Sequence, residues 1–79
     1  MNILELKEAT RDYVIYLYRP DGKGSYGEIR VNINDDESVI ILHANEDNSI
    51  GYYAQKAVKA VKECIKERNL PLEFTQAWH

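Results

Sequence analysis

Residues 28–34, with the sequence EIRVNIN, alternate strictly between polar and apolar side chains. Ile29, Val31 and Ile33 lie on one side of such an extended chain, and their polar neighbours lie on the other. Because successive side chains of a strand point to opposite faces, this pattern predicts a strand with one face on a hydrophobic core. A strand of this kind is stable only within a sheet, so the chain must supply partners for it.

Two neighbouring segments have the composition of such partners. Residues 13–19, YVIYLYR, are rich in aromatic and β-branched side chains, and residues 38–44, SVIILHA, contain a second apolar run. Both compositions favour strands. Turn-forming residues separate the three segments, since PDGKGSYG precedes residue 28 and acidic residues follow residue 34. We therefore expect three consecutive antiparallel strands.

Both ends of the chain have helical features. Asn2 and Glu5 form a capping-box-like pair, and apolar residues recur at helical spacing as far as Tyr13, which predicts a short first helix. Residues 50–68 predict a longer helix, ended by Asn69 and Pro71. Its apolar side contains Tyr53, Ala54, Ala57, Val58, Val61, Cys64 and Ile65. In the tail, the alternation of Leu72, Phe74 and Trp78 weakly favours one more strand.

These elements predict an α+β fold of order α-β-β-β-α, with a fourth, C-terminal strand as an option and both helices packed on one face of an antiparallel sheet. The length of 79 residues suits a single domain over residues 1–79. A tight turn at Asp35 and Asp36 would place Ile40 and Leu42 opposite Val31 and Ile29. The predicted core face then contains Ile15, Leu17, Ile29, Val31, Ile33, Ile40 and Leu42. The predicted outer face contains Val14, Tyr16, Tyr18, Arg30, Val39, Ile41 and His43.

The predicted outer face is more apolar than a sheet face in contact with water usually is. Three kinds of cover would explain this composition. The tail could lie over it with Phe74 and Trp78, a second copy of the chain could pair with it, or a different protein could bind it. The residues alone leave these three alternatives open.

The stretch GKGSYG, residues 22–27, matches the G-x-G-x-x-G nucleotide-binding pattern. A dinucleotide site needs a helix directly after the glycines, whereas a strand follows them here. The stretch resembles the glycine-rich loop of protein kinases over about eight residues, with Tyr26 and Ile29 at the aromatic and valine positions. The strand at 38–44 has no lysine, however, and the chain has no H-R-D or D-F-G triplet. We interpret the stretch as a hairpin turn whose glycines adopt positive φ angles.

Other catalytic and metal-binding patterns are also missing from the sequence. Cys64 is the only cysteine and lies on the apolar side of the long helix, and His43 and His79 do not form a metal-binding pair. We therefore expect no enzymatic activity, no cofactor and no metal. The lone thiol suits a reducing cytoplasm, and no apolar run is long enough to cross a membrane, so we expect a cytoplasmic protein without a membrane partner.

Two resemblances suggest what the chain could bind. The order α-β-β-β-α resembles the double-stranded RNA-binding domain over residues 2–68, which implies that the loop at 21–27 and the long helix contact duplex RNA. Small acidic anti-CRISPR proteins of phages are similar in the segments RDYVIYL and IRVNIND and in their acidic turns. This second resemblance implies inhibition of a nucleic-acid enzyme by carboxylates placed in a basic groove. The net charge of −3 favours a protein partner over a phosphate backbone.

The sequence thus predicts a small non-catalytic protein-interaction module, which binds a protein partner or forms a homodimer. The candidate partner-binding residues are Tyr16, Tyr18, Arg30, Ile41, His43, Asp35, Asp36 and Glu37. The alternative is nucleic-acid binding through the lysine side of the long helix and the first turn. Its candidate residues are Arg19, Lys23, Lys56, Lys59, Lys62 and Lys66.

Overall fold

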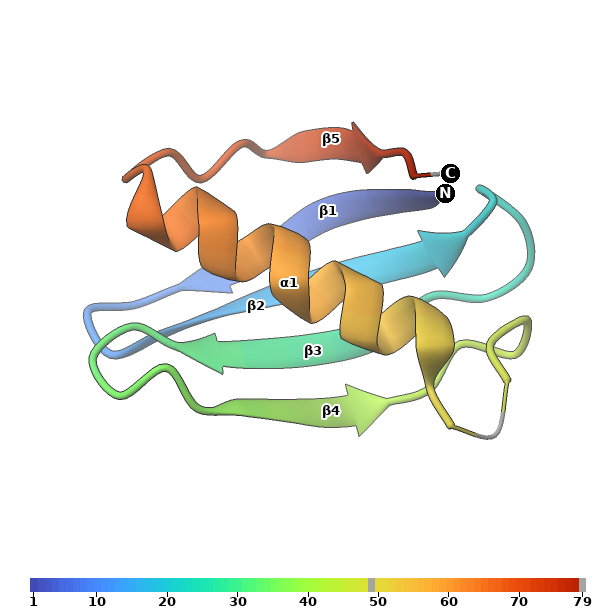
Figure 1. Ribbon diagram of the computed structural model, residues 1–79, viewed down its shortest axis with the longest axis horizontal. Coiled ribbons are helices and arrows are strands. Elements are labelled where there is room, and N and C mark those ends of the chain that lie inside the picture. Colours follow the sequence, from blue (N-terminus) through green and yellow to red (C-terminus); the bar gives the residue numbers. More distant parts are fainter. Residues whose placement is uncertain (49, 79) are drawn as a thin grey trace.

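The fold is one antiparallel five-stranded sheet with a single helix across one face (Figure 1). The computed structural model describes residues 1–48 and 50–78, and Ser49 and His79 lie outside the described residues. The strands follow the spatial order β4-β3-β2-β1-β5. In chain order the elements are β1 (Asn2–Ala9), β2 (Tyr13–Pro20), β3 (Gly27–Asn32), β4 (Ser38–Leu42), α1 (Tyr52–Lys66) and β5 (Glu73–Gln76). The α+β class is confirmed, whereas the predicted order of elements is replaced by β-β-β-β-α-β.

The predicted first helix was wrong, because its residues form strand β1. This strand pairs with β2 on one side and with β5 on the other. Leu4 and Leu6 contact the core at the two-residue spacing of a strand. The segment therefore fits the spacing of a strand as well as that of a helix, and pairing with a strand on each side makes it a strand. Asn2 is not a helix cap but a buried strand residue, whose Nδ2 donates to the carbonyl oxygen of Tyr53 at 3.0 Å.

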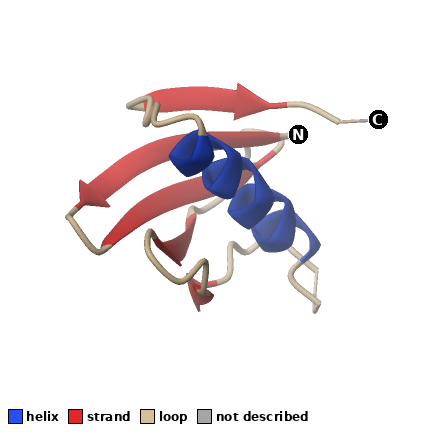
Figure 2. Cartoon of the chain, turned by 60° about the vertical axis from the view of Figure 1, so that its left-hand side comes forward, coloured by secondary structure: helices blue, strands red, loops and turns tan. Residues whose placement is uncertain are grey.

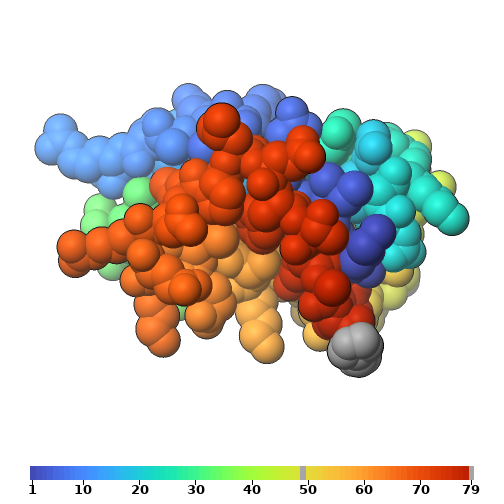
Figure 3. Space-filling model, turned by 90° about the horizontal axis from the view of Figure 1, so that it is seen from above, coloured from blue at the N-terminus to red at the C-terminus, as the bar shows by residue number. Residues whose placement is uncertain are grey.

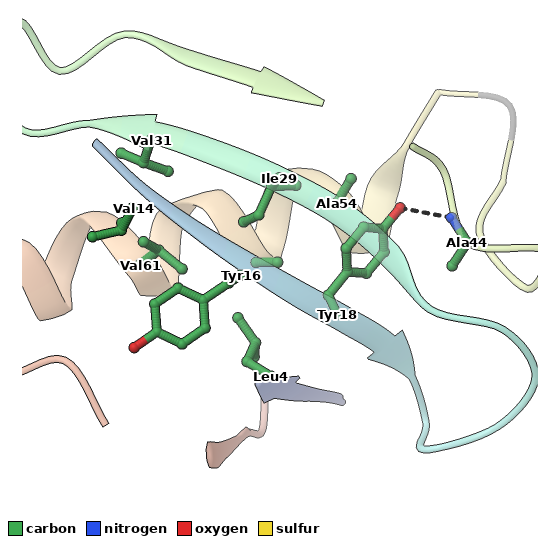
Figure 4. Close-up of a cluster of buried hydrophobic side chains, with 10 residues drawn as sticks. Leu4, Val14, Tyr16, Tyr18, Ile29, Val31, Ala44, Ala54 and Val61 are labelled. Carbon is green, nitrogen blue, oxygen red and sulfur yellow. Dashed lines mark hydrogen bonds between the residues drawn. The ribbon is translucent and has the colours of Figure 1, made fainter. Parts of the chain in front are cut away.

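Helix α1 packs diagonally over β1, β2 and β3, and Figure 2 shows it on one side of the sheet only. Its buried residues, Ala54, Ala57 and Val61, belong to the predicted apolar side. Two of them are alanines, which let the helix approach the sheet closely. Figure 4 shows the core between the helix and the sheet. Its sheet residues are Leu4, Val14, Tyr16, Tyr18, Ile29 and Val31.

The assignment of β2 to the two faces was wrong. Tyr16 pairs with Ile29 and Val14 pairs with Val31, so both β2 residues lie in the core together with Tyr18. Burial of two tyrosines is tolerated because both hydroxyl groups have hydrogen-bond partners. Tyr16 donates to the carbonyl oxygen of Pro71 at 2.7 Å, and Tyr18 donates to Asp47 Oδ2 at 2.7 Å.

The other residues of β2 occupy the opposite face of the sheet. Ile15 pairs with Arg30 and Leu17 pairs with Glu28, so the prediction that Ile15 and Leu17 lie in the core was also wrong. The two faces of β2 were exchanged in the prediction because both alternating sets of residues 14–18 are apolar.

The hairpin between β3 and β4 differs from the prediction in register. Ile29 pairs with Ile40 and Val31 pairs with Ser38, which is a shift of two residues that leaves Ile40 on the core side. A bulge then places Leu42 opposite Glu28, and Leu42 is exposed, contrary to its predicted place in the core. The longer turn contains Asp36 at a φ of 61°.

The tail contributes β5, which confirms the optional C-terminal strand. Phe74 contacts Tyr16 edge to face with ring centroids 5.7 Å apart, and the Trp78 ring lies 5.6 Å from that of Tyr53 at the start of α1. Both aromatic residues of the tail therefore lie on the helix side and leave the opposite sheet face uncovered. Figure 3 shows the C-terminal segment next to the first residues of the chain. Among the described residues, no helix combines the length and the apolar character needed to cross a membrane.

Candidate functional site

The glycine-rich turn connects β2 to β3, and each of its three glycines has a structural explanation. Gly22 and Gly24 have φ angles of 69° and 70°, which residues with a Cβ rarely adopt. Gly27 lies under the ring of Tyr18, and a Cβ at Gly27 would overlap that ring. The interpretation as a hairpin turn is confirmed, and the helix that a phosphate cradle needs does not follow the glycines.

Asp47 is the centre of the largest group of hydrogen bonds to one side chain in the described residues. Its Oδ2 accepts the Tyr18 hydroxyl at 2.7 Å and the Ala54 N–H at 3.1 Å. Its Oδ1 accepts the Tyr53 N–H at 2.9 Å. His43 Nδ1 lies 3.8 Å from Asp47 Oδ2. The carboxylate thus satisfies the second and third N–H groups of α1, a role that sequence reasoning missed although an acidic residue before a helix is a known signal.

The Asp47 cluster connects the loop before α1 to the buried Tyr18 of β2. Burial, and then the neighbouring Asp47 carboxylate, raise the pKa of Tyr18, while the N–H of Ala44 donates to the Tyr18 hydroxyl at 3.0 Å and lowers it. The Tyr18 side chain is fully buried and therefore remains a neutral donor without access to a substrate.

The face of the sheet opposite α1, which we call the helix-free face, mixes apolar and charged residues. Its central residues, Ile15, Leu17, Glu28 and Arg30, are half-buried. The Arg19 guanidinium lies 4.9 Å from the ring centroid of Tyr26, and Lys7 Nζ lies 2.7 Å from Glu28 Oε1. By strand alternation this face contains Ile3, Glu5, Ile15, Leu17, Arg19, Glu28, Arg30 and Val39.

Strand β4 borders this face and has a partner strand on one side only. We call its residues 38–42 the β4 edge. Val39, Ile41 and Leu42 are 45 %, 48 % and 55 % exposed, and the strand SVIIL contains no charged residue. Its outer N–H and C=O groups face no strand formed by the described residues. Exposed apolar side chains therefore coincide with an open sheet edge.

Most of the predicted partner-binding residues lie along β4. Arg30 pairs with Val39, and Ile41 belongs to the β4 edge. The exposed acidic turn, Asp35, Asp36 and Glu37, leads into β4, and the exposed His43 follows it. Tyr16 and Tyr18 are fully buried and do not belong to this surface, so their prediction as surface residues was wrong.

The predicted nucleic-acid-binding residues do not form one surface. Arg19 lies on the helix-free face, whereas the four lysines lie on α1, on the other side of the sheet. Lys56 Nζ lies 5.6 Å from the ring centroids of Tyr52 and Trp78. Lys62 Nζ lies 3.6 Å from Asp36 Oδ2. Lys23 is exposed in the turn between β2 and β3, and Lys59 and Lys66 are exposed on the helix.

The candidate site is therefore the β4 edge, with the helix-free face on one side and the acidic turn at its start. Comparisons with protein-family models, with curated proteins and with solved structures give no match for this chain.

Proposed function

We propose that this protein is a non-catalytic protein-interaction module that binds its partner at the β4 edge and the adjoining helix-free face. The observation that supports this most directly is the exposure of Val39, Ile41 and Leu42 on a strand with open backbone hydrogen-bonding groups. Edge strands of this kind pair readily with a strand of another chain. The apolar side chains would supply affinity, and the backbone groups would fix the register.

The acidic turn indicates the chemistry of the partner. Asp35, Asp36 and Glu37 are all exposed at the start of β4, so a partner with basic residues beside an apolar strand or groove complements this surface. Occupation of the basic groove of a nucleic-acid enzyme, as in anti-CRISPR inhibition, is the concrete form of this proposal. Direct binding of nucleic acid ranks second, because the basic residues are divided between two faces and three of them already contact other side chains.

The proposal is tested by affinity capture from the native host with four baits, which are the wild-type chain and three variants that each differ from it by one residue. Val39→Lys and Ile41→Lys place a charge on the β4 edge. Leu72→Lys adds the same charge at a residue that is 77 % exposed and lies outside this surface. We expect the wild-type chain and Leu72→Lys to retain the same proteins, and the two β4 variants to lose them. Equal retention by all four baits would refute the proposal.

Light scattering of the purified chain over a concentration series identifies self-association. A dimer that Ile41→Lys dissociates and Leu72→Lys preserves would mean that the partner is a second copy. A gel shift with duplex RNA at low salt tests the second-ranked function, since phosphate contacts are strongest there.

A further inference from the structure

We infer that a second site, at the C-terminal end of α1, binds a small amphipathic carboxylate such as a medium-chain fatty acid. An open pocket of about 440 Å³ lies there, lined by Ile33, Ile65, Leu70 and Arg68. Its volume is within the range of ligand-binding pockets. Three of the four lining residues are aliphatic, which suits a hydrocarbon chain and disfavours a strongly hydrated anion such as free phosphate.

Arg68 occupies a backbone position that normally belongs to glycine. The N–H of Asn69 donates to the carbonyl oxygen of Cys64 at 3.0 Å, and the N–H of Arg68 donates to that of Ile65 at 3.1 Å. These two bonds form a complete Schellman motif, in which Arg68 is the left-handed residue, with a φ of 56°. Glycine adopts this conformation without strain, whereas arginine does not. A strained arginine at the mouth of a pocket points to a role for its side chain.

The guanidinium of Arg68 has no competing acidic partner. Within residues 1–48 and 50–78, no carboxylate oxygen lies within 4.0 Å of it, whereas Lys62, two turns earlier, is paired with Asp36. A planar guanidinium binds a carboxylate through two parallel hydrogen bonds. The pocket therefore offers a charged group for the head of the ligand and aliphatic side chains for its tail. Ile65 and Arg68 belong to the helix side, so the inference does not depend on the proposed protein-binding surface.

The inference is tested by titrating the intact chain with decanoate and with decanol, followed by calorimetry and by amide chemical shifts. Arg68→Gly removes the guanidinium and also relieves the backbone strain, so this variant should melt at a higher temperature than the wild-type chain. We expect it to bind decanoate at least about tenfold more weakly, as for loss of a charge-assisted hydrogen bond. Arg68→Lys keeps the positive charge and should retain much of the affinity.

Decanol has the same tail without the charge, so it should bind the wild-type chain and Arg68→Gly equally weakly. Decanoate should shift the amide signals of Ile33, Ile65 and Leu70. Three results would each overturn the inference: no decanoate binding, equal decanoate affinity in the wild-type chain and Arg68→Gly, or shifts centred on the β4 edge.

Discussion

At the scale of single residues, the choice between the two faces of β2 depends on hydroxyl groups. Within residues 14–18 both alternating sets are apolar, and the only charged residue of the segment, Arg19, lies at its end, so the local sequence contains little preference. Tyr16 and Tyr18 can lie in the core because their hydroxyl groups donate hydrogen bonds to the Pro71 carbonyl oxygen and to Asp47. These acceptors are 55 and 29 residues away in the sequence. Such distant partners cannot be recognised from one sequence. The same error removed Tyr16 and Tyr18 from the candidate site, whereas Arg30 and Ile41 were placed on the surface correctly.

Because Tyr16 is buried, the free energy of unfolding should decrease at alkaline pH. Burial, with a smaller effect of Cys64, raises the pKa of Tyr16 to about 12, whereas an unfolded tyrosine titrates near 10. Below pH ~10 both states keep the phenol proton, and stability is constant. As the pH rises from ~10 to ~12, only the unfolded state ionises, so the free energy of unfolding falls by on the order of 2 kcal/mol.

Tyr16→Phe separates this effect from other alkaline effects. At neutral pH it should lower the free energy of unfolding by about 1 kcal/mol, because the hydrogen bond to Pro71 is lost. Above pH ~10 it should lose less stability than the wild-type chain. Urea unfolding at a series of pH values measures both quantities, and parallel alkaline profiles of the two proteins would contradict the assignment.

At the scale of elements, a prediction was correct where the spacing of apolar residues fits only one kind of secondary structure. The long apolar stripe of α1 fits only a helix, and the predicted range of 50–68 contains the observed Tyr52–Lys66. Residues 2–9 fit helical and strand spacing equally well, and pairing with β2 and β5 makes them a strand. Helix α1 starts at Tyr52, after the predicted residue 50, because Asn48 and Asp47 accept the N–H groups of Tyr52 and Tyr53, and Gly51 has a φ of 69°.

Asp47→Ala should destabilise the start of α1 strongly. The change removes the acceptor of the Tyr18 hydroxyl and of the Tyr53 and Ala54 N–H groups, and it leaves a buried hydroxyl group without its acceptor. We expect a loss of about 2–4 kcal/mol in the free energy of unfolding, from combined capping and hydrogen-bond terms. Thermal unfolding followed by circular dichroism measures it.

The adjacent Asn48→Ala is the matched control for this experiment. It removes one hydrogen bond, from the N–H of Tyr52 to Asn48 Oδ1 at 2.9 Å, and should cost about 1 kcal/mol. Similar losses for the two variants would show that Asp47 contributes no more than a single capping hydrogen bond.

At the scale of the whole molecule, α1 covers one face of the sheet, and no other described helix covers the opposite face. The acidic turn could be predicted as a surface feature, because a run of charged residues between two apolar strands indicates a turn. The order of the strands could not, because the pairing of β1 with β5 joins the two ends of the chain. Asn2 and Gln76 connect that pairing to the helix, since Asn2 Nδ2 donates to Gln76 Oε1 at 3.2 Å and Gln76 Nε2 donates to the Lys56 carbonyl oxygen at 2.8 Å.

A double-mutant cycle measures this connection. Asn2→Ala and Gln76→Ala should each destabilise the fold, and the double variant should lose less than the sum, with a coupling of about 0.5–2 kcal/mol. The reason is that each residue loses its partner when the other is replaced. Chemical denaturation of the four proteins gives the coupling, and strict additivity would mean that the two amides act independently.

The position of β5 also determines the order in which the chain can fold. Strands β1 to β4 are joined by short turns, so their contacts are local and can form early. Strand β5 reaches its place beside β1 only after α1 has crossed the sheet from the β4 side, and its contacts have the largest sequence separation in the molecule. Closure of that long loop is expected to come late in folding. Until β5 pairs with it, β1 has an unpaired edge in addition to that of β4. Another strand can pair wrongly with this edge while the chain is still folding.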